Sequence, residues 1–433
     1  MKGFRDSTCG GQGIKSGGLL SLASLLLMAG LLATWTTAVA SGTLTTRGVG
    51  MGSAQVAVAS GLDAVGINPA SLGMPGSGTF GFRIFDVGMI VHNSTVSIGF
   101  YNRYNGDSLD TSEKEDILAH IPDSGLEARS QADIQLFGVR IKRFAVSLSA
   151  SASLAGALPK DLFRIVLQGI DVGKTYDLAP RGGGVAYAKL GLSYGQPLRL
   201  VYFDDFAVGG TFNYVGGIGY AEIIRSTGRV VVDYQSAVKS ELVGRTGLGG
   251  NGFSLDLGVA ARRGNVRFGA ALLSLASHIN WTQQTEEAVL RFVGDSVNVY
   301  ALEDLGPDEL FDKQDTTYSI PSFGTSLPPE LVVGVATRWR GFLLAADYHQ
   351  YLRNRFGAST TPELALGAEK RVLAVLPFRL GVALGGGKGF RPSFGFGLHL
   401  GAFKWDFALG GVGGFLPPQQ RGLYFGTSLK FSF

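Results

Sequence analysis

The side chains near the C-terminus alternate between two kinds. From 423 to 433, one set of alternate positions is mostly large and apolar, and the positions between them are mostly small or polar. The first set is Leu423, Phe425, Thr427, Leu429, Phe431 and Phe433, and the second includes Gly426, Ser428, Lys430 and Ser432. A period of two indicates a β-strand with two different faces.

The same alternation recurs in many segments upstream. The apolar faces include Phe403/Trp405/Phe407/Leu409, Phe394/Phe396/Leu398/Leu400, Leu364/Leu366, Phe342/Leu344/Tyr348, Phe268/Leu272 and Phe253/Leu255/Leu257. Beyond the first forty residues there is no run of about 20 apolar residues that could cross a membrane as a helix. The sequence therefore predicts an all-β fold.

Soluble β-sandwiches and membrane β-barrels both alternate, so the composition of the two faces decides between them. In a sandwich the second face is solvated and rich in Lys, Glu and Thr. Here it is mostly Gly and Ala, and the chain has 65 Gly in 433 residues with only 17% charged residues. Small residues suit a wall that coils and closes on itself, and aromatic residues on the other face suit the girdles at a lipid interface. We therefore predict a transmembrane antiparallel β-barrel.

Counting strands back from the C-terminus predicts about 14 strands, within a range of about 12–16. The first strand is placed at 90–104, and a strand-like segment at 77–87 would be an odd fifteenth or join a plug. Tight turns are expected at 143–144, 263–265, 340–341 and 402–403. Long extracellular loops are expected near 105–130, 156–180, 219–250 and 278–327, with short helices at 111–120, capped by Thr111, and at 159–168.

The first forty residues have the features of a secretory signal peptide. Lys2, Arg5 and Lys15 form a basic region, 19–32 is apolar, and Ala38-Val39-Ala40 is a small-x-small site that predicts cleavage after Ala40. The single cysteine, Cys9, lies inside this peptide, so the mature chain has no thiol for a disulfide, a metal site or a nucleophile. The expected destination is the outer membrane of a bacterial cell.

The beginning of the mature chain differs from the rest, because it is Gly-rich, nearly uncharged and has no strand period. It carries Arg47, Gly50-Met51-Gly52, Ala54, Ala57, Asp63 and Asn68-Pro69-Ala70-Ser71-Leu72. This pattern resembles the N-terminal hatch of the long-chain fatty-acid transporter (FadL-like) superfamily, which includes PorV/PorQ-like relatives. The resemblance implies a 14-stranded barrel over 77–433 whose lumen is blocked by a hatch or plug at 41–76, with Asp63, Asn68, Pro69 and Ala70 as candidate ligand or hatch residues.

Polar residues on the small face are candidates for contacts in the lumen. They are Arg338, Asp347, His349, Glu369, Arg379 and His399. His349 and Asp347 form the one suggestive pair, but a His-Asp pair without a nucleophile is incomplete for catalysis. The five histidines lack metal-ligand spacing, and the small net charge of +4 does not suit nucleic acid. We expect no enzyme activity, metal or cofactor.

The glycine run Gly385-Gly386-Gly387-Lys388-Gly389 superficially resembles a phosphate-binding loop. It lacks the following Ser or Thr and lies at the end of a strand rather than before a helix, so the match carries no nucleotide site.

The C-terminal residues resemble the assembly signal of bacterial outer-membrane barrels, an aromatic-Gly-x-x-apolar-x-aromatic run that ends in Phe. The residues that carry this pattern are Phe425, Gly426, Leu429, Phe431 and Phe433. A last strand with free backbone groups and alternating aromatics suits pairing with a barrel assembly machinery. The alternative is that Phe433 is one more girdle aromatic.

Three functions are compatible with this sequence. The first is a FadL-like carrier of hydrophobic small molecules, and the second is a PorV-like, non-transporting barrel that binds secreted or assembling protein partners. The third, an open aqueous porin, is disfavoured because a hatch and a Gly/Ala lumen leave little wet width. Outer-membrane lipid and the assembly machinery are the other expected partners.

Overall fold

The computed structural model describes residues 44–76, 78–106, 108–171, 173–231, 237–295 and 312–433. The predicted signal peptide and its cleavage site lie outside these residues. No helix in the described part of the chain is long and apolar enough to cross a membrane.

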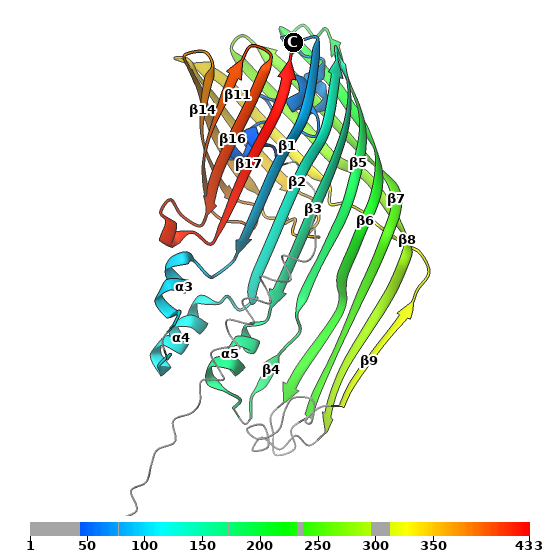
Figure 1. The fold of residues 1–433 in the computed structure, drawn as a ribbon, viewed down its shortest axis with the longest axis vertical. Coiled ribbons are helices and arrows are strands. Elements are labelled where there is room, and N and C mark those ends of the chain that lie inside the picture. Colours follow the sequence, from blue (N-terminus) through cyan, green and yellow to red (C-terminus); the bar gives the residue numbers. More distant parts are fainter. Residues whose placement is uncertain (1–43, 77, 107, 172, 232–236, 296–311) are drawn as a thin grey trace, which may run out of the picture. The chain divides into compact units, whose positions relative to one another are not determined.

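Within the described residues, fourteen antiparallel strands form a closed ring, because the first strand, β1, pairs with the last, β17 (Figure 1). The ring consists of β1 (Phe80–Asn93), β2 (Leu126–Ile141), β3 (Phe144–Leu158), β5 (Arg181–Leu198), β6 (Asp205–Val231), β7 (Ala237–Arg263), β8 (Val266–Asp295), β11 (Glu330–Trp339), β12 (Phe342–Tyr351), β13 (Glu363–Val372), β14 (Leu376–Gly385), β15 (Arg391–Leu400), β16 (Phe403–Val412) and β17 (Gly422–Ser432). The predicted fold class and strand number are confirmed.

Three short strands add to the wall. β4 (Thr175–Asp177) pairs with β6, while β9 (Asp312–Ser319) and β10 (Phe323–Thr325) pair with β8. β4 and β9 lie toward the end of the barrel opposite the C-terminus, where the long connections are (Figure 1).

The first strand was placed wrongly. β1 runs from Phe80 to Asn93, so the segment at 77–87 belongs mostly to it and no odd fifteenth strand arises. Residues Ile98–Tyr104 form helix α3, because the Ser97 hydroxyl accepts a hydrogen bond from the Phe100 N–H (3.1 Å) and caps a helix where a strand was expected.

Two of the predicted loops are also wrong in part. Strands β6, β7 and β8 have 27, 27 and 30 residues, so most of 219–250 and the first part of 278–327 are strand. A membrane strand needs only about 9–11 residues. This part of the wall therefore continues far beyond the 10-residue strands β11 to β16 (Figure 1).

The two expected helices are present. α4 (Thr111–His120) has the predicted bounds, but Asp110 rather than Thr111 caps it, in a capping box with Glu113. α5 (Lys160–Gln168) follows Pro159, as expected.

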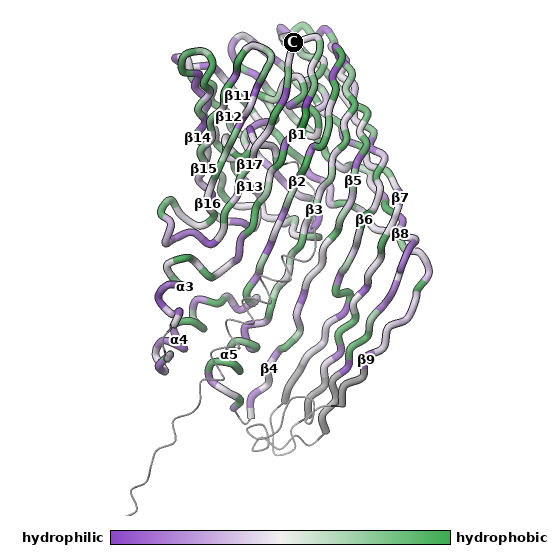
Figure 2. The backbone as a smooth tube through the Cα atoms, viewed as in Figure 1, coloured by the Kyte–Doolittle hydropathy of each residue, from purple (hydrophilic) through white to green (hydrophobic). Residues whose placement is uncertain are grey.

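Figure 2 shows hydrophobic and hydrophilic residues following one another along the strands, and the exposure of the side chains agrees with the predicted faces. Leu364 and Leu380 are 58% and 63% exposed on the outer face, whereas the inward Ala365 and Ala383 are 1% and 2% exposed. A depression of about 750 Å³ lies among outward residues of β12 to β17 such as Leu366, so it belongs to the outer surface.

Candidate functional site

Residues 44–76 lie against the inner face of the barrel wall. This segment contains α2 (Thr46–Gly50) and two 3₁₀ turns, η1 (Gly61–Ala64) and η2 (Pro69–Leu72). Its small apolar side chains pack on inward alanines from strands on several sides of the ring: Met51 and Ala54 on Ala365 and Ala383, Ala70 on Ala207 and Ala260, and Val65 with Ala145. The segment therefore contacts much of the circumference of the lumen.

Inward glycines of the strands explain how the segment fits so closely. A methyl group added at Gly381 would overlap the backbone of Met51 and Gly52, and one at Gly209 would overlap that of Pro69 and Ala70. Similar overlaps with the segment arise at Gly88, Gly195, Gly258, Gly269, Gly367 and Gly426. The high glycine content of the inner face thus serves backbone-to-backbone packing.

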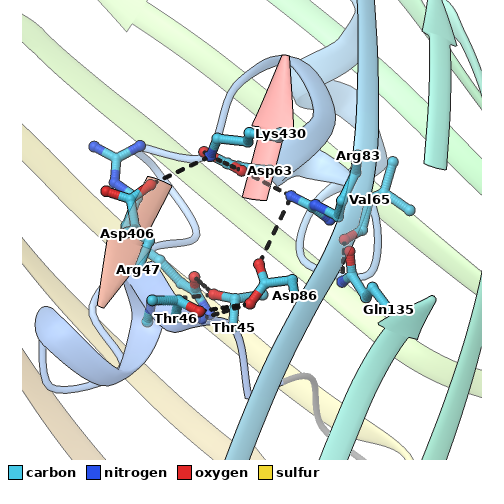
Figure 3. A network of polar contacts seen from close by, with 12 residues as sticks. Thr45, Thr46, Arg47, Asp63, Val65, Arg83, Asp86, Gln135, Asp406 and Lys430 are labelled. Carbon is cyan, nitrogen blue, oxygen red and sulfur yellow. Dashed lines mark hydrogen bonds and ion pairs between the residues drawn. The ribbon is translucent and has the colours of Figure 1, made fainter. Parts of the chain in front are cut away.

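Buried carboxylates on three strands hold backbone N–H groups of the segment. Asp347 on β12 accepts from the N–H groups of Gln55 (2.6 Å) and Val56 (2.7 Å). On the opposite part of the ring, Asp86 on β1 accepts from the N–H and hydroxyl of Thr46 (2.9 and 2.8 Å; Figure 3). Asp133 on β2 accepts from the N–H of residue 44 (3.0 Å). Each of these buried side chains of the wall accepts a hydrogen bond from a backbone N–H of the segment, so losing one would leave a buried polar group unpaired, and together they anchor the segment.

Asp63 is the acidic residue of the segment and sits between two cations of the wall. Its carboxylate is 2.6 and 2.8 Å from Lys430 Nζ on β17 and 2.8 Å from Arg83 Nη2 on β1 (Figure 3). Burial alone would raise the pKa of Asp63, but Lys430 and Arg83 outweigh it and hold the pKa well below its usual range. Asp63 is therefore ionised at neutral pH and locks the segment to the strands that close the barrel.

A second ionic cluster lies beside the first. Arg379 donates to Glu369 (2.9 Å) and to Asp406 (2.7 Å), and Arg47 of the segment lies 3.2 Å from Glu369. His399 Nε2 is 3.0 Å from Asp406. The charges in this cluster are paired, so it is a structural lock without a free reactive group.

Asn68 shapes the turn that follows. Its side chain accepts from the Ala70 N–H (3.1 Å) and donates to the carbonyl oxygens of Val259 (3.0 Å) and Val56 (3.4 Å). Pro69 occupies the first turn of η2, where its missing N–H costs nothing. The Asn-Pro-Ala element therefore caps η2 and ties it to β7.

Toward the end of the long connections, the lumen holds a buried aromatic cluster. Tyr187, Tyr220 and Trp281 come from β5, β6 and β8, and Phe323 and Phe356 come from the connections before β11 and after β12. The Tyr220 ring lies 5.1 Å from Phe323 and 5.9 Å from Phe356 between centroids. Trp281 Nε1 donates to Thr325 Oγ1 (2.8 Å). Two connections thus fold over a shared aromatic surface.

The model of a family of unknown function, DUF5723, matches residues 71–247 and 233–409. The chain belongs to the DUF5723 family. No curated protein matches the chain.

Solved structures show which fold this DUF5723 chain shares. It is similar to the toluene transporter TbuX of Ralstonia pickettii (14% identity, TM-score 0.50, 91% of this chain and 99% of that one). Similar matches are the toluene transporter TodX of P. putida (9% identity, TM-score 0.50, 91% and 99%) and a FadL homologue of Pseudomonas aeruginosa (12% identity, TM-score 0.50, 92% and 100%). The expected resemblance to FadL-type outer-membrane barrels is confirmed at the level of the fold.

The DUF5723 chain brings most of the predicted lumen residues together. Asp347, Glu369, Arg379 and His399 contact the N-terminal segment or its ionic cluster. Arg338 is separate, because it is exposed at the end of β11.

His349 does not form the pair with Asp347 that the sequence suggested. Its Nδ1 lies 3.1 Å from Glu330, and its Nε2 lies 3.3 Å from the carbonyl oxygen of Ser53. In the part of the chain that the structure describes, no group of three His, Cys, Asp or Glu side chains could hold a metal ion.

Several partners were missed from the sequence: Arg83, Asp86, Asp133, Glu330, Asp406 and Lys430. Asp406 and Lys430 occupy the small face of their strands, so the alternation did carry a signal for them.

The residues of the C-terminal pattern all lie in or next to β17. Phe425 faces outward and Gly426 faces the N-terminal segment, close to Thr46. Leu429 and Phe431 pair with Phe85 and Phe82 of β1, and the Phe433 N–H donates to the Phe80 carbonyl (2.9 Å). Their role as an assembly signal stays a prediction.

Proposed function

We propose that this chain is an outer-membrane carrier for small hydrophobic molecules, which enter the lumen at the end of the long connections. The observation that carries the proposal is the aromatic cluster of Tyr187, Tyr220, Trp281, Phe323 and Phe356. Ligand sites are concave, mostly apolar and equipped with a few polar groups that orient the ligand. Here the Trp281 indole N–H and the Tyr220 hydroxyl supply such groups at the edge of aromatic faces.

The two connections that carry Phe323 and Phe356 cover this cluster, so we propose that a ligand enters when one of them moves. The backbone of Phe356 is held by Ser153 Oγ, and Arg355 lies 2.9 Å from Glu222 on β6. A hydrophobic ligand could take the place of the Phe323 or Phe356 ring beside Trp281. Trp281 would then keep an apolar neighbour, and the connection that carries the displaced phenylalanine would move away. For the ligand to leave at the other end of the barrel, the N-terminal segment would have to shift. The free energy of that step would depend on the ion pairs that Asp63 and Arg47 make with the wall.

The similarity in fold to proteins named as toluene transporters supports a carrier. None of the three structures named above is a secretion-associated barrel, and we do not propose the PorV-like alternative.

Trp281 provides a direct test. In a variant with Trp339→Phe and Trp405→Phe, Trp281 is the tryptophan of the described residues that remains, and the refolded barrel is titrated with toluene in detergent. We expect a saturable change in Trp281 fluorescence, weakened several-fold by Phe356→Ala and unaffected by Phe425→Ala on the outer face. A change in Trp281 fluorescence that rises linearly with toluene concentration and does not saturate would contradict the proposal, because toluene would then only be dissolving in the detergent.

Transport itself is tested in cells. Cells that express the protein in the outer membrane should accumulate labelled toluene faster than cells without it, and Phe356→Ala should reduce the gain. Equal uptake in cells with and without the protein would leave a binding protein rather than a carrier.

A further inference from the structure

The turn between β14 and β15 places a lysine among four glycines. Gly385, Gly386, Gly387 and Gly389 have φ values of 97°, 65°, 71° and 75°, which side chains other than glycine rarely adopt. The Lys388 side chain is only 13% exposed and lines two internal cavities. Turn lysines are normally solvated, so this glycine-rich turn serves to carry an ammonium group inward.

The two cavities adjoin each other. They measure about 60 and 20 Å³, and they share Gln131, Tyr351, Gly386 and Lys388 as lining residues. One water molecule needs roughly 10–15 Å³. The space therefore admits a small polar ligand beside the Lys388 ammonium.

Two carboxylates, Glu330 and Glu363, line the larger cavity, and each has a closer partner than Lys388: Glu330 contacts His349 (3.1 Å) and Glu363 pairs with Arg391. Glu363 is shared, because it pairs closely with Arg391 and lies 4.0 Å from Lys388 Nζ, beyond hydrogen-bond distance. Burial lowers the pKa of Lys388, and the attraction of Glu363 offsets only part of that effect. Among the described residues, Lys388 has no hydrogen-bonded carboxylate.

Two further groups line the smaller cavity. Arg129 donates to the Gly357 carbonyl (3.2 Å) and to Glu127 (2.7 Å). His92, which is 7% exposed, lines the same cavity, and its ring makes no hydrogen bond with another described residue. Lys388, Arg129, Arg391 and Arg421 lie near enough to His92 to act on it electrostatically.

We propose that the smaller cavity, where it opens toward the larger one, binds a small oxyanion between Lys388, Arg129 and the His92 imidazole. The oxyanion is a carboxylate or a phosphate. Ammonium and guanidinium groups form their strongest hydrogen bonds with these anions. A bound anion would give Lys388 a hydrogen-bonded partner closer than Glu363. It would also join the β14–β15 turn to β1 and β2 at the rim of the lumen. The proposal does not depend on the carrier function, because it needs neither the aromatic cluster nor transport.

Titration calorimetry on the refolded barrel in zwitterionic detergent tests the site, with sodium acetate and sodium phosphate as separate probes. We expect saturable binding of at least one probe, which identifies the class of anion. Lys388→Met should weaken that binding tenfold or more, while Lys370→Met, which removes an exposed lysine from the other end of β13, should change it less than twofold.

Arg129→Gln provides a second variant if Lys388→Met does not fold, as judged by migration of unheated and boiled samples. We expect it to weaken binding of the same probe as well. The absence of saturable heat with both probes would overturn the proposal. Equal losses of binding affinity in Lys388→Met and Lys370→Met would also overturn it, because the probe would then be attracted only by the net charge of the protein.

Discussion

Lys430 on the last strand places its ammonium 2.6 and 2.8 Å from the two carboxylate oxygens of Asp63 in the N-terminal segment. The same carboxylate contacts Arg83 on the first strand. One acidic residue of the segment therefore bridges the two strands whose pairing closes the barrel. Seating of the segment and closure of the ring are coupled through this contact.

Replacing Asp63 by Asn should destabilise the folded barrel by about 3–5 kcal/mol, because removing one partner of a buried ion pair leaves its cations uncompensated. Urea unfolding of the refolded protein at neutral pH measures the loss. Asp177→Asn, at an exposed position in β4, is the control and should have little effect. Equal midpoints for wild type and Asp63→Asn would show that the bridge contributes nothing.

The effect of Asp63 should depend on pH in a defined direction. Its folded-state pKa lies below the unfolded value near 3.8, so its stabilisation is complete above that value and is lost as the pH falls toward the folded pKa. The difference between wild type and Asp63→Asn should therefore be constant near neutrality and shrink below about pH 4. Unfolding series at several pH values measure this, and a difference that grows on acidification would contradict it.

The inward glycines give a second prediction. Gly381→Ala adds a methyl group that overlaps the backbone of Met51 and Gly52, whereas Gly216→Ala on β6 meets no atom within 4 Å. Overpacking of this kind typically costs about 1–3 kcal/mol or displaces the intruding element. Urea unfolding should show a lower stability for Gly381→Ala than for wild type, or limited trypsin digestion should show faster cleavage at Arg47. Gly216→Ala should change neither measurement.

The outer face gives a third prediction. Leu409 is 48% exposed on β16 among other apolar residues, and an arginine there would face lipid. Leu409→Arg should cost about 2–4 kcal/mol if the position is near the middle of the bilayer, while Leu409→Phe should cost much less. Folding yields into lipid vesicles measure both, and equal tolerance would mean that this face does not contact lipid.

The wall could be predicted from the sequence where one face contacts lipid and the other is packed. There, residues such as Leu364 and Ala365 differ in both size and polarity, and the period of two is clear. The extensions of β6 to β8 escaped prediction because charged residues such as Arg225, Glu241 and Arg291 replace the apolar face. Beyond a membrane strand, both faces can be polar and the period disappears.

The sequence could predict which side chains of the candidate site point into the barrel, but not which residues they contact there. Alternation places Asp347 and Arg379 inside, yet it cannot say which of them meet across the lumen, because those contacts join residues far apart in the sequence. Asp347 holds Gln55 and Val56 and not His349. Gly397 shows the same limit: its sequence position places it on the small face, but only the structure shows that an added methyl group would overlap the Asp406 carboxylate.

The last prediction concerns Phe433. Its N–H donates to the Phe80 carbonyl (2.9 Å) and its carbonyl accepts from the Thr79 N–H (3.1 Å), while its ring, 65% exposed, lies 5.9 Å from that of Phe80. If Phe433 serves only in the finished barrel, its deletion removes these contacts at a strand end and up to about 3 kcal/mol of burial, with little change in the rate of assembly. If it is recognised before closure, its deletion should slow barrel insertion severalfold while leaving secretion intact, because the last strand must be held while its edge is still unpaired. Pulse-chase measurement of the trypsin-resistant barrel distinguishes the two, with Phe433→Tyr as a control that keeps an aromatic end. We expect slow insertion for the deletion and a normal rate for Phe433→Tyr, and equal rates for the deletion and wild type would exclude the assembly role.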